Sequence, residues 1–126
     1  MILACSGGSN VGQITNQAAV ELTREGFGKM FCLAGVAAGL KSFVKAAGDS
    51  PDVLVLDGCP VGCAKAAMVN AGLSSFGYMV VTELGIDKVK DRALAMNQAD
   101  VDAVKAAARS SAELAGQAGG CSSCAG

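Results

Sequence analysis

Histidine and tryptophan are both absent from this chain of 126 residues. Without histidine the chain cannot build a mixed cysteine–histidine zinc site, and it has no imidazole to act as a general base. Aromatic residues make up only 4% of the sequence, although 52% of it is hydrophobic. We therefore expect one domain with a tight aliphatic core, since this length is sufficient to bury one.

Charge is also sparse, because 10 basic and 11 acidic residues leave a net charge of −1. The basic residues are dispersed and form no stripe, which argues against a nucleic-acid partner. No apolar run approaches the roughly 20 residues of a membrane span, and the N-terminus lacks the features of a signal peptide. We expect a cytoplasmic protein, and there cysteines are more often metal ligands or reactive thiols than disulfides.

Strand and helix patterns alternate along the chain. The predicted strands are residues 1–4, 29–33, 53–57 and 78–82, and the predicted helices are residues 13–25, 36–47, 60–70 and 98–115. This alternation predicts a Rossmann-like, three-layer α/β domain over residues 1–115, with a four-stranded parallel sheet. We expect the strand order 2-1-3-4, which would place the first three strands side by side.

Cysteine occurs six times, and three of these residues stand at the downstream end of a short apolar run. They are Cys5, Cys32 and Cys59, and Cys63 follows Cys59 at helical spacing. The carboxyl ends of parallel strands lie along one edge of a sheet, so the fold would gather these four thiols. Adjacent strands are about 4.8 Å apart, and sulfurs around a zinc ion are under about 4 Å apart. The pattern indicates a four-thiolate metal site or a redox thiol cluster.

The sharpest motif is DGCPVGC, at residues 57–63. We expect Pro60 to be the first residue of a helix, which places Cys59 near its N-cap and Cys63 on the same face. A thiolate there would be stabilised by free N–H groups and the helix dipole. Asp57 could accept backbone N–H bonds or orient a ligand. The alternative is that both cysteines simply fill a tight helix–strand junction.

The loop CSGGSNVG, at residues 5–12, opens the first helix. Its N–H groups could form an anion nest, or its glycines could merely permit a tight turn. The loop resembles the anion cradle of low-molecular-weight phosphatases, but Val11 and Gly12 stand where those loops need an arginine. Phosphatase chemistry is therefore disfavoured, and a nucleotide or anion binder is a third hypothesis.

Together, CSGGSNVG, FCLAG and LDGCPVGC resemble motifs of the DGC-domain family of proposed zinc-binding proteins, which is named after its Asp-Gly-Cys motif. The resemblance covers about residues 1–114. It implies zinc binding by Cys5, Cys32, Cys59 and Cys63, and it implies no established reaction.

Residues 116–126 are rich in glycine and are expected to form a flexible tail. The tail contains a C-x-x-C pair, Cys121 and Cys124, outside the family resemblance. Such a pair could reach the main site, bridge to a partner, oxidise, or have no function.

The leading hypothesis is a small zinc-binding protein in which Cys5, Cys32, Cys59 and Cys63 hold a structural or transported metal. We favour Zn²⁺ over an iron–sulfur centre, although four thiolates suit both. The alternative is a thiol-based redox or sulfur-handling enzyme, with Cys59 as nucleophile and Cys63 or Cys5 as the resolving thiol. The sequence does not separate these two hypotheses, and whether the protein is an enzyme stays open.

Overall fold

The computed structural model describes the backbone of residues 1–125 and the side chains of residues 1–112. Within that range the chain forms an α/β fold around a parallel sheet of three strands, in the order β1-β2-β3. The strands are β1 (Ile2–Ala4), β2 (Leu54–Asp57) and β3 (Gly77–Val80). The register pairs Ala4 with Leu56 and Asp57 with Val80, so the carboxyl ends of all three strands lie at one edge.

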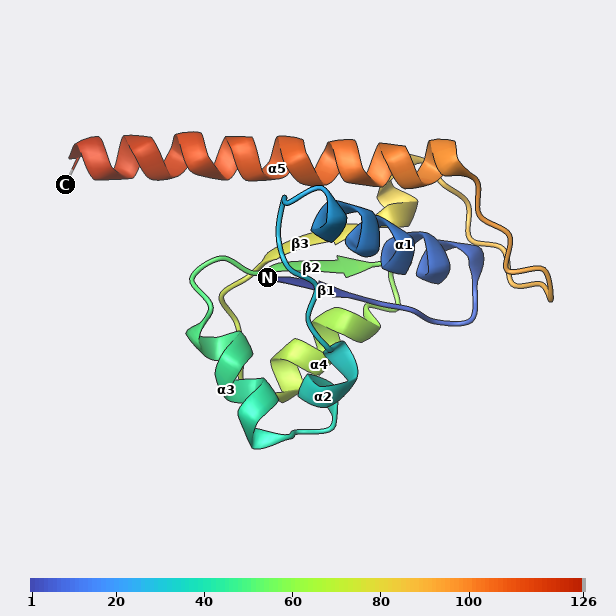
Figure 1. Ribbon diagram of the computed structural model, residues 1–126, viewed down its shortest axis with the longest axis horizontal. Helices are drawn as coiled ribbons and strands as arrows, with labels where there is room; N and C mark the ends of the chain where they lie inside the picture. Colours follow the sequence, from blue (N-terminus) through green and yellow to red (C-terminus); the bar gives the residue numbers. More distant parts are fainter. Residues whose placement is uncertain (126) are drawn as a thin grey trace.

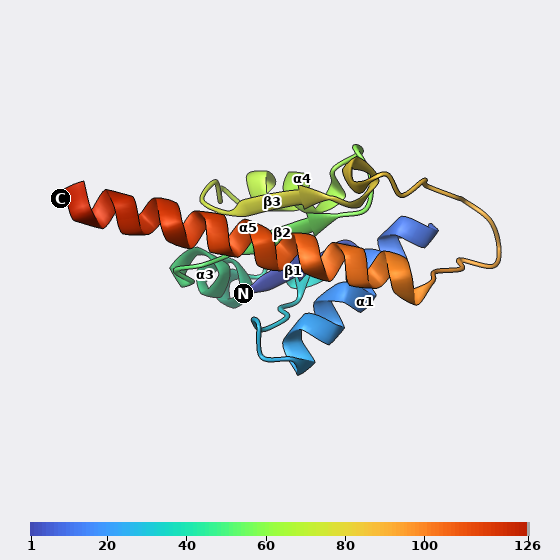
Figure 2. The same ribbon diagram turned by 90° about the horizontal axis from the view of Figure 1, so that it is seen from above.

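Helices lie on both faces of the sheet (Figure 1). One face is covered by α1 (Asn10–Arg24) and α5 (Gln98–Ala125), which pack against each other. The other face carries α2 (Leu33–Ala37), α3 (Lys41–Asp49) and α4 (Cys63–Asn70). A short 3-10 helix, η1 (Val81–Leu84), follows β3. The view from above shows α5 crossing over the strands (Figure 2).

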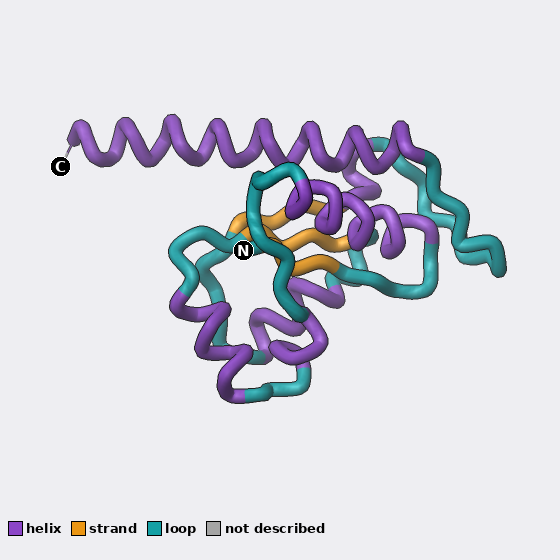
Figure 3. Tube along the Cα trace, in the orientation of Figure 1, coloured by secondary structure: helices purple, strands orange, loops and turns teal. Residues whose placement is uncertain are grey.

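The predicted sheet of four strands with order 2-1-3-4 is wrong. Residues 29–33, predicted as the second strand, form only one isolated bridge to β1, between Met30 and Ile2. Ile2 donates to the Lys29 carbonyl and accepts from the Phe31 amide, both at 2.8 Å. The extended stretch ends there because helix α2 begins at Leu33, so the segment is a loop beside β1 (Figure 3).

The helices predicted at residues 36–47 and 60–70 also need correction. Residues 36–47 form no single helix, because Gly39 adopts a left-handed φ of 71° between α2 and α3. The helix predicted from Pro60 begins instead at Cys63, with Gly62 as N-cap at φ 70°. Pro60 and Val61 form a turn, so Cys59 precedes the helix by a full turn and shares no helical face with Cys63.

The backbone of α5 is helical through Ala125, beyond the predicted boundary at Ala115. The side chains of Cys121 and Cys124 lie outside the described residues, so the predicted separability of the tail stays a prediction. Within the described part of the chain, no helix is long and apolar enough to cross a membrane.

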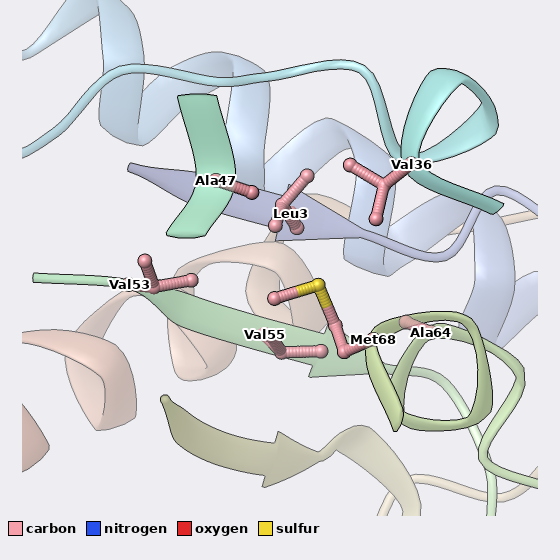
Figure 4. Packing of buried hydrophobic residues seen from close by; sticks show 7 residues of the cluster. All are labelled: Leu3, Val36, Ala47, Val53, Val55, Ala64 and Met68. Atoms are coloured by element: carbon pink, nitrogen blue, oxygen red, sulfur yellow. The ribbon is translucent and has the colours of Figure 1, made fainter. Parts of the chain in front are cut away.

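The core beneath the sheet joins β1 and β2 to the helices on that face (Figure 4). Leu3 and Val55 are completely buried there, and Ala64 and Met68 of α4 lie against them. The remaining buried members of this cluster are Val36, Ala47 and Val53. This packing places the first turn of α4 directly beyond the end of β2.

Asp57, the last residue of β2, caps the first turn of α4. Its carboxylate is buried and accepts hydrogen bonds from the amides of Ala64 and Lys65, at 2.8 and 3.0 Å, and from the Tyr78 hydroxyl at 2.7 Å. The two amides belong to the first helical turn, where N–H groups lack partners within the helix. Gly62 offers no side-chain cap, so Asp57 supplies one from the strand end.

Replacing Asp57 with alanine should lower the free energy of unfolding by about 3 kcal/mol, because it leaves two helix amides and the Tyr78 hydroxyl without their acceptor. Tyr78→Phe removes only one of these bonds and should lower it by about 1 kcal/mol. Urea unfolding of both variants measures the difference. Equal losses would show that Asp57 does not cap α4.

Ending the chain after Ala115 should leave the thermal midpoint nearly unchanged. The buried contacts of α5 that the described side chains show come from Val101, Val104 and Ala108, all before the cut. As a control, Val104→Ala should lower the free energy of unfolding by about 2 kcal/mol. A large drop in the midpoint on truncation would show that residues 116–126 belong to the fold.

Candidate functional site

The backbone register brings three cysteines to the carboxyl edge of the sheet. The Cys5 amide donates to the Leu56 carbonyl at 2.9 Å, so Cys5 continues the ladder one position beyond β1. Cys59 follows β2, which ends at Asp57, with only Gly58 between them. Cys63 is the first residue of α4, which Asp57 holds at the same edge.

Glycine backbones pack the two motif loops directly on each other. A Cβ atom at Gly58 would lie 2.8 Å from the Gly12 nitrogen, and one at Gly12 would lie 2.7 Å from the Gly7 carbonyl oxygen. Real Cβ atoms do not approach backbone this closely. The DGC loop therefore rests on the start of α1 only because these positions lack side chains.

Cys59 makes the most distinctive contact of the site. Its sulfur is 3.1 Å from Nζ of Lys88, a half-buried ammonium that donates a hydrogen bond to it. Burial acts to raise the pKa of the Cys59 thiol, but the Lys88 ammonium and the Val61 amide stabilise the thiolate, and the net pKa lies below its ordinary value.

Asn10 holds the segment that carries Lys88. Its side-chain amide donates to the Asp87 carbonyl at 2.8 Å and accepts from the Val89 amide at 2.6 Å. Its own backbone amide donates to the Val89 carbonyl at 3.2 Å. Both peptide neighbours of Lys88 are thus tied to the first residue of α1. In Figure 1 the long loop between η1 and α5 lies at the same end of the sheet as the loop after β1.

Cys5 is in a different environment on the opposite side of the sheet edge. It packs against the cluster that includes Leu3 and Met68, whereas Cys59 packs against the cluster of Val11 and Ile14. Burial raises the pKa of the Cys5 thiol, and the nearby charges of Asp57 and Cys63 raise it further. The Gly7 and Gly58 amides oppose this shift without reversing it.

Cys32 and Cys63 are exposed. Cys32 is the N-cap of α2, with no hydrogen bond from its side chain to that helix. Across the described side chains, no three cysteine, aspartate or glutamate residues are grouped so that they could hold a metal ion. The ligand set of Cys5, Cys32, Cys59 and Cys63 therefore stays a prediction.

Two amides of the loop at residues 5–12, those of Ser9 and Gly12, bond to groups within the loop. Ser9 caps α1 by accepting from the Gly12 amide at 3.2 Å, and the Ser9 amide itself donates to the Gly7 carbonyl. The Gln13 side chain donates to the carbonyls of Ser6 and Gly7. These bonds favour the interpretation of a packed turn over that of an open anion nest.

The sequence analysis did not identify three residues of the site, which are Lys88, Asn10 and Tyr78. Lys88 lies in a loop without a motif, and its role depends on a contact 29 positions away in sequence. Asn10 belongs to CSGGSNVG. Because Ser9 already caps the helix, the side-chain amide of Asn10 can bond instead to the loop that carries Lys88. Tyr78 donates to Asp57, and burial together with that carboxylate raises its pKa.

A shallow cavity of about 470 Å³ adjoins the DGC loop. Pro60, Val61 and Gly62 form one side of it, and Tyr78 and Val80 of β3 contribute to another. Val61 is 71% exposed, so the DGC loop presents an apolar side chain beside this cavity.

Two comparisons with known proteins found a match to this chain. The family model of the DGC domain matches residues 1–108. The anaerobic and virulence modulator AnvM of Pseudomonas aeruginosa is 34% identical over 88 residues, which are 70% of this chain and 67% of AnvM. No solved structure matches the chain. The match to the family model covers both cysteine-bearing loops, and the chain belongs to the DGC-domain family.

Proposed function

We propose that this protein carries out thiol–disulfide exchange, with Cys59 as the attacking thiolate. The observation that carries the proposal is the 3.1 Å contact between the Cys59 sulfur and Nζ of Lys88. The thiolate is the nucleophile in thiol chemistry, and a neighbouring ammonium increases its population near neutral pH.

In this reaction the Cys59 thiolate attacks one sulfur of a partner disulfide and releases the other sulfur as a thiolate. A second thiol of the protein then attacks the mixed disulfide at Cys59 and frees the partner. Cys63 is suited to that second step because it is exposed and only four positions away. The cavity beside Val61 gives the partner an apolar surface at the same loop.

The name of the related AnvM describes an anaerobic and virulence modulator. A thiol that changes its redox state would suit a comparable modulating role in this chain, and this part of the proposal rests on the relationship alone.

Replacing Lys88 with methionine should raise the pKa of Cys59 and slow its exchange with a small aromatic disulfide roughly tenfold near neutral pH, because the thiolate loses its ammonium partner. The curve of rate against pH should move to higher pH. Lys90→Met is the matched control, since Lys90 is exposed in the same loop, and it should leave the curve in place. An unmoved curve in Lys88→Met would refute the assigned role of Lys88.

Binding of a thiophilic metal is the second candidate function. The observation in its favour is that Cys5 lies close enough to Cys63 for the charge of Cys63 to raise its pKa, at an edge that Cys59 shares. Four thiolates are suitable donors for Zn²⁺. Because no three donors are grouped in the described side chains, binding would require these side chains to reorient.

If metal binding is the function, reduced protein purified without oxygen should contain close to one equivalent of Zn²⁺, and Cys59→Ser should lose most of it. The affinity should fall as the pH drops, because thiolate ligands must be deprotonated. A double variant, Cys121→Ser with Cys124→Ser, is the control that should keep its metal. Unchanged zinc in Cys59→Ser would exclude Cys59 as a ligand.

A further inference from the structure

We propose that Cys59 and Lys88 form an oxidative modification site, at which peroxide-oxidised Cys59 is captured by the Lys88 amine in a covalent S–N bond. This inference rests on the proposed function, because it requires Cys59 to be the reactive thiol. The S–N bond gives the protein a reversible inactive state, in which Cys59 cannot attack a disulfide and is protected from further oxidation.

The two reacting atoms are already in contact, with Sγ of Cys59 3.1 Å from Nζ of Lys88. Across the described side chains Lys88 forms no salt bridge, and Asp57, the acidic residue of the DGC motif, is engaged elsewhere. The Asp57 oxygens are bonded to two helix amides and to Tyr78. The sulfur is therefore the interaction partner that holds the Lys88 amine in place.

The backbones that carry both atoms are held by the same structural element, the N-terminus of α1. Asn10 binds the peptide groups on either side of Lys88, and Gly58 lies against Val11 and Gly12. The Gly58 carbonyl also accepts from the Thr82 amide at 3.2 Å, which ties the DGC loop to η1. This shared attachment keeps sulfur and amine adjacent when the thiol changes its chemical state.

The chemistry balances with one molecule of hydrogen peroxide as the oxidant. The Cys59 thiolate attacks one peroxide oxygen, forming a sulfenic acid and releasing hydroxide, so that sulfur loses two electrons and peroxide gains them. That hydroxide takes a proton from the Lys88 ammonium and becomes the first water. The resulting neutral amine then attacks the sulfur, and the hydroxyl of the sulfenic acid leaves as the second water with a proton from the amine. In sum, one thiol, one amine and one peroxide give one S–N bond and two waters. A sulfenic acid condenses with a backbone nitrogen to give an S–N bond, and here the Lys88 amine takes the place of that nitrogen.

Cys63 is the competitor, because it could form a disulfide with oxidised Cys59. The two products differ in the thiols they consume, since the S–N bond removes one thiol per chain and the disulfide removes two. They also differ at Lys88, because trypsin does not cleave after a lysine whose amine carries sulfur.

The test treats the full-length, reduced protein with one equivalent of hydrogen peroxide, followed by thiol titration and tryptic mass mapping. We expect the loss of one thiol, a missed cleavage at Lys88, and a cross-linked species joining the Cys59 and Lys88 peptides that lacks two hydrogens. Excess dithiothreitol should reverse all three changes. The cross-link should persist in Cys63→Ser and in Lys90→Arg, and it should be absent in Lys88→Arg, which keeps the charge without a comparable nucleophile.

Loss of two thiols with normal cleavage at Lys88 would overturn the inference, as would sulfinic acid at Cys59 in the wild-type protein. Either result leaves the proposed function intact if Cys59 still exchanges with disulfides. Failure of Cys59 to exchange with disulfides or to react with peroxide would instead reject the proposed function, and this inference with it.

Discussion

The site depends on close backbone contacts at glycine residues, which lie between the DGC loop, the N-terminus of α1 and the loop before it. Gly58 lies against Val11 and Gly12, and Gly12 lies against Gly7, at distances that no side chain permits. This contact sets the DGC loop directly on the N-terminus of α1. Asn10, the first residue of that helix, then holds the loop of Lys88 over Cys59. The glycines of both motifs are therefore structural requirements for the position of a thiol.

Asp57 separates two environments at this edge. It is buried, and its carboxylate is occupied by the first turn of α4 and by Tyr78. Of the two roles considered for it, accepting backbone N–H bonds is confirmed, and this leaves it unsuited to act as a general base. Its charge adds to the effect of burial in raising the pKa of Cys5. The same charge acts to raise the pKa of Cys59, but the Lys88 ammonium lowers that pKa by more. The pKa values of two cysteines at the same edge are thereby shifted in opposite directions.

Sequence patterns predicted the parallel α/β class and the strand-end positions of Cys5 and Cys59, because apolar runs and glycine punctuation are local signals. The family resemblance, based on the three cysteine motifs, is confirmed by the match to the DGC-domain model. The strand predicted at residues 29–33 did not form, because the apolar residues of this segment are divided between an extended stretch and helix α2, and the stretch is too short to become a strand. Lys88 could not be predicted, since its contact with Cys59 arises only when the η1–α5 loop is fastened to Asn10.

The central claim is that electrostatics, and not exposure, determines which thiol reacts. Cys32 and Cys63 are exposed, whereas Cys59 is half-buried beside Lys88. The most direct test is competitive labelling of the native, reduced protein at neutral pH with a limiting amount of iodoacetamide, with site occupancy measured by mass spectrometry. The account predicts that Cys59 is labelled first. Labelling of Cys32 or Cys63 ahead of Cys59 would contradict it.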